Sequence, residues 1–359
     1  MIAYRRMPKR KIFVGLSGGV DSSVAAWRLL QQGYDVVGVF IKVWQPEFLS
    51  CNWEQERRDA MRIAAYLHIP FLTCDAEAAY RQSVAEYFIR EYAAGRTPNP
   101  DVMCNKYVKF GAFREFASSY GVLDIATGHY AQISSDGAGQ YFLRRGEDDS
   151  KDQSYFLWTI PKTQLPTIHF PIGDSMKVDV RKEAARVGLP TAQKSDSQGI
   201  CFLGQVDIPA FLSHFIDIEP GVVCDLSGTP IGTHRGALTY TIGQRTGLHI
   251  KHRELAGNSH YVHRIDLKNN CLYVSSEAPV ATEATQLQLQ ACNQIVPWCV
   301  GSTVNVQYRY RQLPVKATLL DVTADTATLR LSNTSSQWAA GQSCVLYQDD
   351  ICLGGGIIV

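Results

Sequence analysis

Residues 15–23, Gly-Leu-Ser-Gly-Gly-Val-Asp-Ser-Ser, form the first group of side chains that could do chemistry. They follow an apolar run at residues 11–16 that is typical of a strand and precede a segment that favours a helix. A glycine-rich turn in this position presents backbone N–H groups and the positive helix end to an anion. The serines add hydroxyl donors, and the paired glycines let the backbone approach a phosphate closely. A ligand-free turn would account for a bare Gly-Gly pair, but the full set of residues favours a phosphate site.

The type of phosphate loop follows from what accompanies the glycines. The stretch is not a Walker loop, because no lysine follows the glycines, and it is not GxGxxG. The Ser-Gly-Gly-x-Asp-Ser pattern resembles the pyrophosphate loop of ATP pyrophosphatases, which split ATP between the α and β phosphates. That resemblance implies that ATP transfers its AMP group to a substrate, which activates the substrate, and that pyrophosphate leaves. Asp21 alone would repel phosphates, which suggests that Mg²⁺ lies between them.

Two cysteines lie in segments suited to thiol chemistry. Cys104 is expected where a helix begins, with Lys106 and Lys109 in its first two turns. A helix N-terminus and nearby cations both favour a thiolate. A buried packing cysteine is the usual alternative, and for Cys104 alone it would be preferred. Cys201 changes this preference because it follows a polar, glycine-containing loop; if both loops lie at the carboxyl ends of parallel strands, the thiols converge on one site.

The bulk composition sets limits on the class of protein. A chain of 359 residues with 45% hydrophobic and 19% charged residues predicts two or three globular domains. The sequence contains no apolar run of about 18 residues, so it predicts no membrane span. The apolar part of the basic N-terminus is short, which argues against a signal peptide. The 10 cysteines show no CxxC or zinc-ligand spacing, so we expect reduced thiols in a cytoplasmic protein. A net charge of +1 requires any nucleic acid to bind through local patches.

Strand and helix signals alternate through the first two hundred residues. We expect strands at residues 11–16, 35–41, 70–73 and 124–127, and helices at residues 24–32, 54–67, 76–94 and 104–120. Gly33 and Gly95 are placed as helix ends, and Asp75 as an N-cap. Two prolines in residues 96–101 break the helical pattern. This alternation predicts an α/β domain with a doubly wound parallel sheet over residues 1–208.

The later part of the chain has a different texture. Short strands separated by glycine and threonine turns predict a small central linking domain at residues 209–281. Strict alternation then places Val304, Val306, Tyr308 and Tyr310 on one strand face, and a second alternating strand follows at residues 327–332. We expect a C-terminal antiparallel β-barrel at residues 282–359.

Motifs along nearly the whole chain are similar to those of the tRNA-specific 2-thiouridylase family, MnmA. In the family's order they are SGGVDSS at 17–23, NPDVMCNKYVKFG at 99–111, ATGHYA at 126–131, KDQSYFLW at 151–158, KSDSQGICF at 194–202, TIGQRTGL at 241–248, RYRQ at 309–312 and GQSCVLYQDDICLGGGII at 341–358. Together they are far more specific than the phosphate loop alone.

The resemblance implies roles for individual residues. The ATP-binding positions correspond to Gly15, Leu16, Ser17, Gly18, Gly19, Val20, Asp21, Ser22, Ile41 and Gly128. The loop that holds the target base corresponds to Asn99, Pro100 and Asp101, and the tRNA contacts correspond to His129, Lys151, Asp152, Gln153, Arg309, Tyr310 and Gln342. The nucleophile corresponds to Cys104 and the persulfide carrier to Cys201, with Asp21 needed for adenylation.

The same resemblance implies the reaction. ATP with Mg²⁺ adenylates the C2 oxygen of the wobble uridine of tRNA, and a persulfide on Cys201 supplies the sulfur. Cys104 completes the transfer by attacking the persulfide or by releasing its terminal sulfide, and both routes leave a Cys104–Cys201 disulfide. We expect a sulfur-donor protein (a cysteine desulfurase or relay protein), no iron–sulfur cluster, no bound metal beyond the Mg²⁺ of the substrate, no membrane and a monomer. Residues 45–53 are shorter than the acidic, cysteine-bearing insert of many members, so that insert's contacts do not carry over.

Alternative interpretations remain at several points. The loop would also suit an AMP-forming amidating enzyme such as a GMP or NAD synthetase, although an ammonia-supplying domain is missing, and a non-catalytic RNA-binding protein could retain the fold. His129 fits RNA contact or loop packing about equally, and Arg309 without the resemblance would be a solvated arginine. His260 and His263 lack carboxylate or cysteine partners at metal-ligand spacing and are interpreted as structural.

Overall fold

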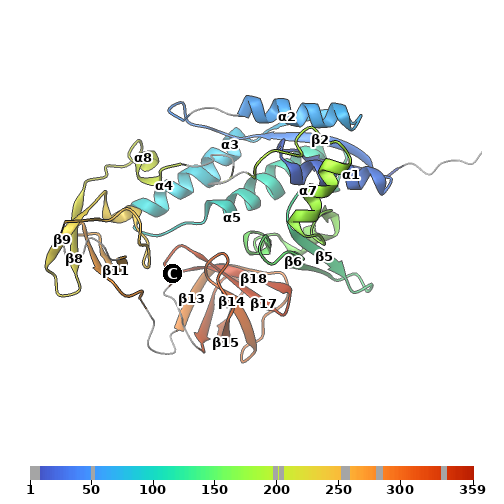
Figure 1. Ribbon diagram of the computed structural model, residues 1–359. Coiled ribbons are helices and arrows are strands. Elements are labelled where there is room, and N and C mark those ends of the chain that lie inside the picture. Colours follow the sequence, from blue (N-terminus) through green and yellow to red (C-terminus); the bar gives the residue numbers. More distant parts are fainter. Residues whose placement is uncertain are drawn as a thin grey trace, which may run out of the picture. The chain divides into compact units, whose positions relative to one another are not determined.

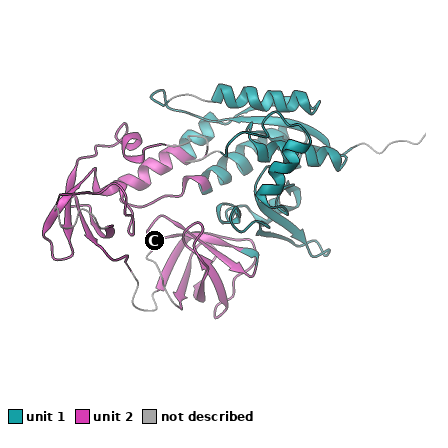
Figure 2. Ribbon diagram, viewed as in Figure 1, with its two compact units in different colours: residues 1–83, 102–198, 350–352 teal, residues 84–101, 199–349, 353–359 magenta. Residues whose placement is uncertain are grey.

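The structure, a computed structural model, describes residues 9–49, 53–196, 201, 206–251, 259–279, 286–332 and 338–359 (Figure 1). The chain forms two compact units (Figure 2). Unit 1 contains residues 1–83, 102–198 and 350–352, and unit 2 contains residues 84–101, 199–349 and 353–359. Each unit is therefore assembled from separate stretches of sequence.

Unit 1 is built on a parallel sheet. Its strands are β1 (Lys11–Gly15), β2 (Asp35–Lys42), β3 (Phe71–Asp75), β4 (Ile125–Ala126) and β7 (Ile168–His169). They are ordered β3-β2-β1-β4-β7, and each adjacent pair is parallel. The order reverses between β1 and β4, so the predicted doubly wound sheet is confirmed with its topological switch point at these two strands.

Helices cover both faces of this sheet. On one face, Ile12 and Val14 of β1 share a core cluster with residues of α1 (Val20–Gln31) and α2 (Trp53–Tyr66). On the other face, the ring of Phe13 packs against Phe116, which belongs to α6 (Phe113–Ser119). Alternate residues of β1 thus face opposite layers, as the period of a strand requires.

Two helical runs differ from the expected ones. The run expected at residues 76–94 consists of α3 (Glu77–Tyr80), a π-helical segment η1 (Arg81–Ala85) and α4 (Glu86–Ala93). Asp75 Oδ1 accepts the Glu77 N–H at 3.1 Å, although the N-cap itself is Ala76. The run expected to start at Cys104 starts earlier, with α5 (Pro100–Cys104), the π-helical η2 (Asn105–Ala112) and then α6. Pro100 does not break this helix, because a proline in the first turn gives up no intrahelical hydrogen bond.

Several elements of unit 1 were not expected from the sequence. They are the hairpin of β5 (Ala131–Ser135) and β6 (Tyr141–Arg145), the 3₁₀ turns η3 (Ser154–Phe156) and η4 (Lys162–Thr167), and helix α7 (Lys177–Arg186). Helix α7 packs against α1 through a buried cluster that includes Val24 and Val180. This packing holds the start of α7 near the phosphate loop.

Unit 2 contains a small mixed sheet. It is ordered β10-β9-β8-β12-β11 and consists of β8 (Gly221–Asp225), β9 (Pro230–His234), β10 (His249–Ile250), β11 (Tyr261–Asp266) and β12 (Cys271–Ser275). Helix α8 (Ile208–Leu212) precedes it, and the 3₁₀ turn η5 (Ala237–Thr239) packs into its core with Val223 and Leu272.

Unit 2 also contains the predicted antiparallel barrel. Its strands are β13 (Gln286–Gln294), β14 (Thr303–Gln307), β15 (Val315–Val322), β16 (Ala327–Leu331), β17 (Ser343–Gln348) and β18 (Ile351–Ile358), and the pairing of β13 with β18 closes it. Val304, Val306 and Tyr308 are buried as the alternation predicts. Residues 350–352 are counted with unit 1, where Ile351 and Cys352 pair with β6.

Candidate active site

The phosphate loop occupies the switch point of the sheet. Helix α1 begins at Val20, four residues earlier than expected, so Asp21 and Ser22 lie in its first turn. Gly18 has φ +74°, and a Cβ there would lie 2.7 Å from the Glu56 carbonyl oxygen. Ser22 Oγ accepts the Ser17 N–H at 3.3 Å, which folds the loop back over the helix start. The loop has the tight backbone that phosphate binding at a helix N-terminus requires.

The segment after β4 packs directly on this loop. A Cβ on Gly128 would lie 2.6 Å from the Ser22 nitrogen, so only glycine allows the approach. Ile41, near the end of β2, is 5% exposed, and its Cδ1 would be 3.7 Å from a Cβ on Gly15. The expected ATP-binding positions in the loop, Ile41 and Gly128 therefore lie at one edge of the sheet.

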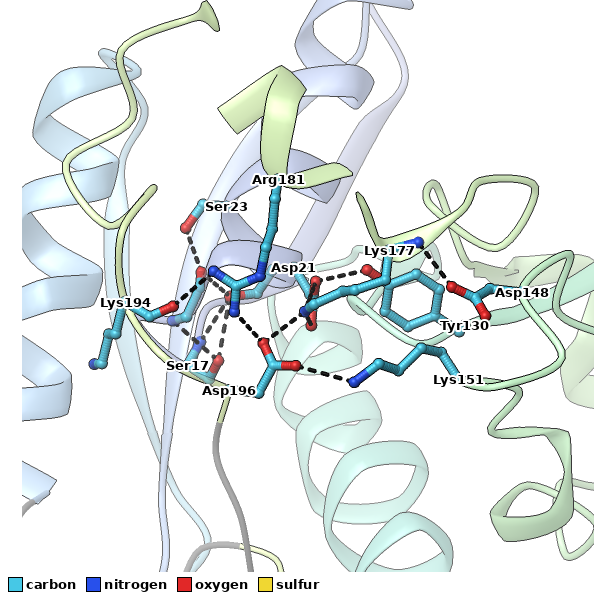
Figure 3. Close-up of polar contacts among 12 residues, drawn as sticks. Ser17, Asp21, Ser23, Tyr130, Asp148, Lys151, Lys177, Arg181, Lys194 and Asp196 are labelled. Atoms are coloured by element: carbon cyan, nitrogen blue, oxygen red, sulfur yellow. Dashed lines mark hydrogen bonds and ion pairs between the residues drawn. The ribbon is translucent and has the colours of Figure 1, made fainter. Parts of the chain in front are cut away.

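Asp21 belongs to an ion-pair network that the sequence did not predict (Figure 3). Lys177 Nζ, at the start of α7, donates to both carboxylate oxygens of Asp21 at 2.7 and 2.8 Å, and the Tyr130 hydroxyl donates to Asp21 Oδ1 at 2.8 Å. The same Lys177 ammonium lies 2.8 Å from Asp196 Oδ1, and Arg181 Nη2 lies 2.5 Å from that oxygen. Three carboxylate oxygens therefore surround one buried ammonium.

The network perturbs the ionisation of its members. Burial alone would raise the pKa of Asp196, but hydrogen bonds from Lys177, Lys151 and Arg181 outweigh it and lower that pKa to about 2. Burial and the neighbouring Asp21 carboxylate raise the pKa of Tyr130. Asp196 is therefore ionised and Tyr130 remains a hydrogen-bond donor at neutral pH.

The side chains of Lys151, Asp152 and Gln153 form hydrogen bonds and ion pairs within the protein. Lys151 Nζ lies 3.2 Å from Asp196 Oδ2. Asp152 is 6% exposed and accepts hydrogen bonds from Arg145 Nη1 and the Ser154 hydroxyl, both at 2.9 Å. Gln153 Oε1 accepts the backbone N–H of Tyr130, the residue whose hydroxyl reaches Asp21. In the described structure these side chains have internal partners, and their expected tRNA contacts stay a prediction.

His129 has the surroundings of a packed side chain. Its ring is 6% exposed and lies against Phe110 and Phe170, and its Nδ1 is 2.6 Å from Thr127 Oγ1. Burial, together with the cation of Lys109 near Nε2, holds the pKa of His129 well below its ordinary value. The sequence left RNA contact and loop packing as alternatives for His129, and these contacts favour packing.

Cys104 lies inside a helix, which corrects its expected position at a helix start. It is the last residue of α5 and is fully buried at 0% exposure. Because α5 begins at Pro100, Asp101 rather than Cys104 is in the first turn. Lys109, expected beside the thiol, has its Nζ 3.4 Å from His129 Nε2, and Lys106 is exposed over the Tyr107 ring.

Cys201 is half-buried in unit 2, where the Asp101 side chain contacts its backbone. Asp101 Oδ1 accepts the Cys201 N–H at 2.9 Å. A residue expected to hold the target base thus also holds the backbone of the expected persulfide carrier.

Two barrel residues expected to contact tRNA support loops of unit 2. Gln342 Nε2 donates to the Thr97 carbonyl at 2.9 Å and to the Pro98 carbonyl at 3.3 Å, which restrains the chain just before Asn99. Arg309 Nη2 donates to the Ile242 carbonyl at 2.7 Å. Tyr310 is partly exposed in the turn after β14, and the next residue has φ +63°. Arg309 and Tyr310 are both partly exposed.

Asp21 is a candidate metal ligand beside the phosphate loop. Within the described ranges, no group of three or more His, Cys, Asp or Glu side chains is arranged to hold a metal ion. The Asp21 carboxylate lies beside the phosphate loop, and its side chain is 31% exposed. Mg²⁺ commonly takes one carboxylate and completes its shell with substrate phosphates and water, so Asp21 fits a Mg²⁺ that arrives with ATP.

Sheet order, switch-point loop and closed barrel together define the class of this protein: a HUP-type α/β domain followed by β-barrel domains. Residues 10–205 match the tRNA methyl transferase HUP domain, residues 209–276 the tRNA methyl transferase PRC-barrel domain, and residues 288–358 the aminomethyltransferase beta-barrel domain. The domain boundaries at 208 and 281 stay predictions.

The chain belongs to the tRNA-specific 2-thiouridylase family, MnmA. It is 43% identical over 361 residues to the tRNA-specific 2-thiouridylase of Cupriavidus necator, which covers 97% of this chain and 98% of that protein. It is 41% identical over 357 residues to the corresponding protein of Streptococcus mutans, with 98% and 95% covered. A solved 4-thiouridine synthetase–RNA complex with bound ATP overlaps in part, at 18% identity and a TM-score of 0.35, over 57% of this chain and 50% of that chain. No helix within the described residues is long and apolar enough to cross a membrane.

Sequence reasoning missed the residues that complete the polar network. Lys177 and Tyr130 contact Asp21 across 156 and 109 residues of sequence. Tyr130 was within the ATGHYA motif but was assigned no role, and Lys177 was in none of the quoted motifs. Asp196 was within a motif of the family resemblance, KSDSQGICF, but was assigned no role. Its two serine neighbours and nearby lysine were the available signal.

Proposed function

We propose that this protein is an ATP-dependent tRNA sulfurtransferase that makes 2-thiouridine at the wobble position. One observation carries the proposal: in a chain of the 2-thiouridylase family, the Ser-Gly-Gly-x-Asp-Ser loop lies at the switch point of a parallel sheet, between β1 and the segment after β4. Ligands of open α/β sheets bind at this place.

Activation of the uridine is the first step. The C2 oxygen attacks the α-phosphate of ATP, an O–P bond forms, and pyrophosphate leaves. The backbone N–H groups at the start of α1 would bind the phosphate oxygens, and Asp21 would hold the Mg²⁺ that accompanies ATP. The poor leaving group on C2 thereby becomes AMP.

Sulfur transfer is the second step. The terminal sulfur of a Cys201 persulfide attacks C2, or is first released as sulfide when the Cys104 thiolate attacks the inner sulfur. AMP leaves from C2 in both routes. In the first route C2 is then joined to Cys201 through an S–S bond, and the Cys104 thiolate attacks the Cys201 sulfur, breaks that bond and releases 2-thiouridine. In the second route the released sulfide attacks C2, and both routes leave a Cys104–Cys201 disulfide. Two electrons from an external thiol must then reduce that disulfide, and a sulfur-donor protein must reload Cys201. The persulfide route requires no iron–sulfur cluster.

Substrate binding draws on unit 2 as well. Tyr310 offers an aromatic face for stacking on a base, which is a common mode of single-stranded RNA recognition. Asn99, Pro100 and Asp101 form the start of α5 and are the candidates for holding the target uridine. We place this protein in the cytoplasm as a monomer.

The test separates activation from sulfur delivery. Cys201→Ser should abolish thiolation, measured by nucleoside mass spectrometry, while tRNA-dependent pyrophosphate release continues. Asp21→Ala should lower both readouts, because Mg²⁺·ATP binds poorly. Cys299→Ser, a change at an exposed cysteine of unit 2, is the matched control and should leave both intact. Normal thiolation by Cys201→Ser would contradict the persulfide assignment.

A further inference from the structure

The phosphate loop of this chain lacks the lysine that Walker loops place directly after their glycines. Helix α7 supplies one from elsewhere. Lys177, the first residue of α7, is held over the loop with its ammonium within 2.8 Å of both Asp21 oxygens (Figure 3). Its side chain is only 10% exposed, so it cannot swing freely into solvent.

Two further cations approach the same place. Arg181 lies one turn after Lys177 on α7, and Lys151 precedes the η3 turn. Their nitrogens lie 2.5 Å and 3.2 Å from the two oxygens of Asp196, and Lys177 Nζ lies 2.8 Å from Asp196 Oδ1. Three cationic groups thus converge on a single carboxylate. Guanidinium and ammonium groups gathered in this way also bind phosphate oxygens, with charge-assisted hydrogen bonds of comparable strength.

A carboxylate oxygen and a phosphate oxygen would compete for the same hydrogen-bond donors of Lys177. An ammonium has three donors, and here the acceptors within reach are Asp21 Oδ1, Asp21 Oδ2 and Asp196 Oδ1. A phosphate oxygen can take one of these donors only if a carboxylate gives it up. The Asp196 side chain is 33% exposed, so it can be solvated when it does.

We propose that Lys177 and Arg181 bind the β and γ phosphates of ATP, which leave as pyrophosphate, and that Asp196 competes with these phosphates for the same two cations. This inference rests on the proposed function and adds binding residues for its leaving group. Cations placed where charge accumulates on the departing pyrophosphate favour the adenylation step. Competition by Asp196 keeps the bound phosphates from being held too tightly to leave.

Direct binding of Mg²⁺-pyrophosphate, measured by isothermal titration calorimetry on the full chain, tests the inference through the signs of the effects. Lys177→Ala should weaken binding by about tenfold or more, and Arg181→Gln should weaken it by at least a few-fold, as expected for lost charge-assisted hydrogen bonds. Asp196→Asn should do the opposite and tighten binding by a few-fold, because the competing charge is gone. The matched control is Lys182→Ala on the same helix, whose side chain is 72% exposed and pairs with Asp179; it should bind as the wild type does.

The outcomes separate this inference from the proposed function. If Asp196→Asn weakens binding together with Lys177→Ala, Asp196 is a structural anchor and the competition is refuted. Unchanged binding by Arg181→Gln and Lys177→Ala would refute the phosphate site itself; if Lys177→Ala does not fold, the Arg181 and Asp196 variants still decide. A wild type that binds ATP and releases pyrophosphate with tRNA, but does not bind added pyrophosphate, overturns the inference and leaves the function standing. A wild type that releases no pyrophosphate with tRNA overturns the function.

Discussion

At the scale of single residues, motif position does not distinguish a ligand contact from internal support. Asp152 illustrates this, since it belongs to a segment whose family counterpart implies RNA contact. Its Oδ1 accepts the N–H groups of Gly146 and Ser154, both at 3.0 Å, and its Oδ2 accepts Arg145 Nη1 and the Ser154 hydroxyl. A carboxylate with four donors around it is part of the fold of this loop.

We therefore expect Asp152→Asn to act on stability. The amide would turn an NH₂ group toward one pair of donors and leave them buried without an acceptor, at a cost of about 1–3 kcal/mol in the free energy of unfolding. Urea denaturation measures this cost, and Asp149→Asn, a change at an exposed neighbour, is the control. Unchanged stability combined with weaker tRNA binding would instead establish an RNA contact.

The ionisation of Asp196 gives a prediction about pH. Its pKa in the folded protein is about 2, below the ordinary value of 3.8, so folding is favoured by its ionised form. That contribution is fully present above pH 3.8 and is lost as the pH falls from 3.8 to about 2. The difference in unfolding free energy between wild type and Asp196→Asn should therefore shrink across this window. A difference that stays constant down to pH 2 would show that the charge of Asp196 does not stabilise the fold.

At the scale of elements, the barrel forms hydrogen bonds with a loop that is far away from it in sequence. Gln342 precedes β17 and donates to the carbonyls of Thr97 and Pro98, and the Thr97 N–H donates to the Ala340 carbonyl at 2.8 Å. A Cβ on Gly341 would lie 2.9 Å from the Thr97 oxygen, so the two chains touch along their backbones. The barrel thus restrains the segment that leads into α5.

Gln342→Met tests whether this residue positions the loop or contacts RNA. Methionine keeps the shape but removes both donors, so the loop before Asn99 should become less ordered. We expect the thiolation rate at saturating tRNA to fall by about tenfold, the factor that corresponds to about 1.4 kcal/mol of lost positioning in the transition state, while the Kd for tRNA changes little. Filter binding and single-turnover kinetics separate the two quantities. A raised Kd with an unchanged rate would favour a direct RNA contact.

Helices and strands with strong local sequence signals could be predicted, but the contacts between them could not. Strands β1 and β2 are continuous apolar runs, and Gly33 and Gly95 have the positive φ expected of helix ends. Strand β4, by contrast, spans only Ile125–Ala126, and its place beside β1 follows from packing rather than from its own sequence. Pro100 was interpreted as a break because proline stops a helix interior, whereas here it begins one.

The candidate site likewise contains residues that the sequence identified and residues that it did not. The phosphate loop could be found because its chemistry is contained in seven consecutive residues. Lys177 could not, because a lysine at the start of a helix has no distinguishing neighbours and gains its role only when α7 packs on α1. The buried state of His129 was equally hidden, since it depends on Phe110 and Phe170 from other elements.

At the scale of the whole molecule, the two units are interlaced in sequence. Unit 1 takes residues 350–352 from the far end of the chain, and unit 2 takes residues 84–101 from the middle of the first two hundred. No cut at one position in the chain yields both units intact. The proposed reaction is therefore best tested on full-length chains that carry single substitutions.

A mixing experiment with such chains tests how the two thiols act. We propose that Cys104 and Cys201 of the same chain form the disulfide in each turnover, so every chain needs both. An equimolar mixture of Cys104→Ser and Cys201→Ser chains should then make no 2-thiouridine, although each variant alone still releases pyrophosphate with tRNA. The wild type without an external thiol should stop after about one turnover per chain, because the disulfide is not reduced. Recovery of thiolation in the mixture would mean that thiols of different copies cooperate, and it would contradict both the intramolecular disulfide and the expected monomer.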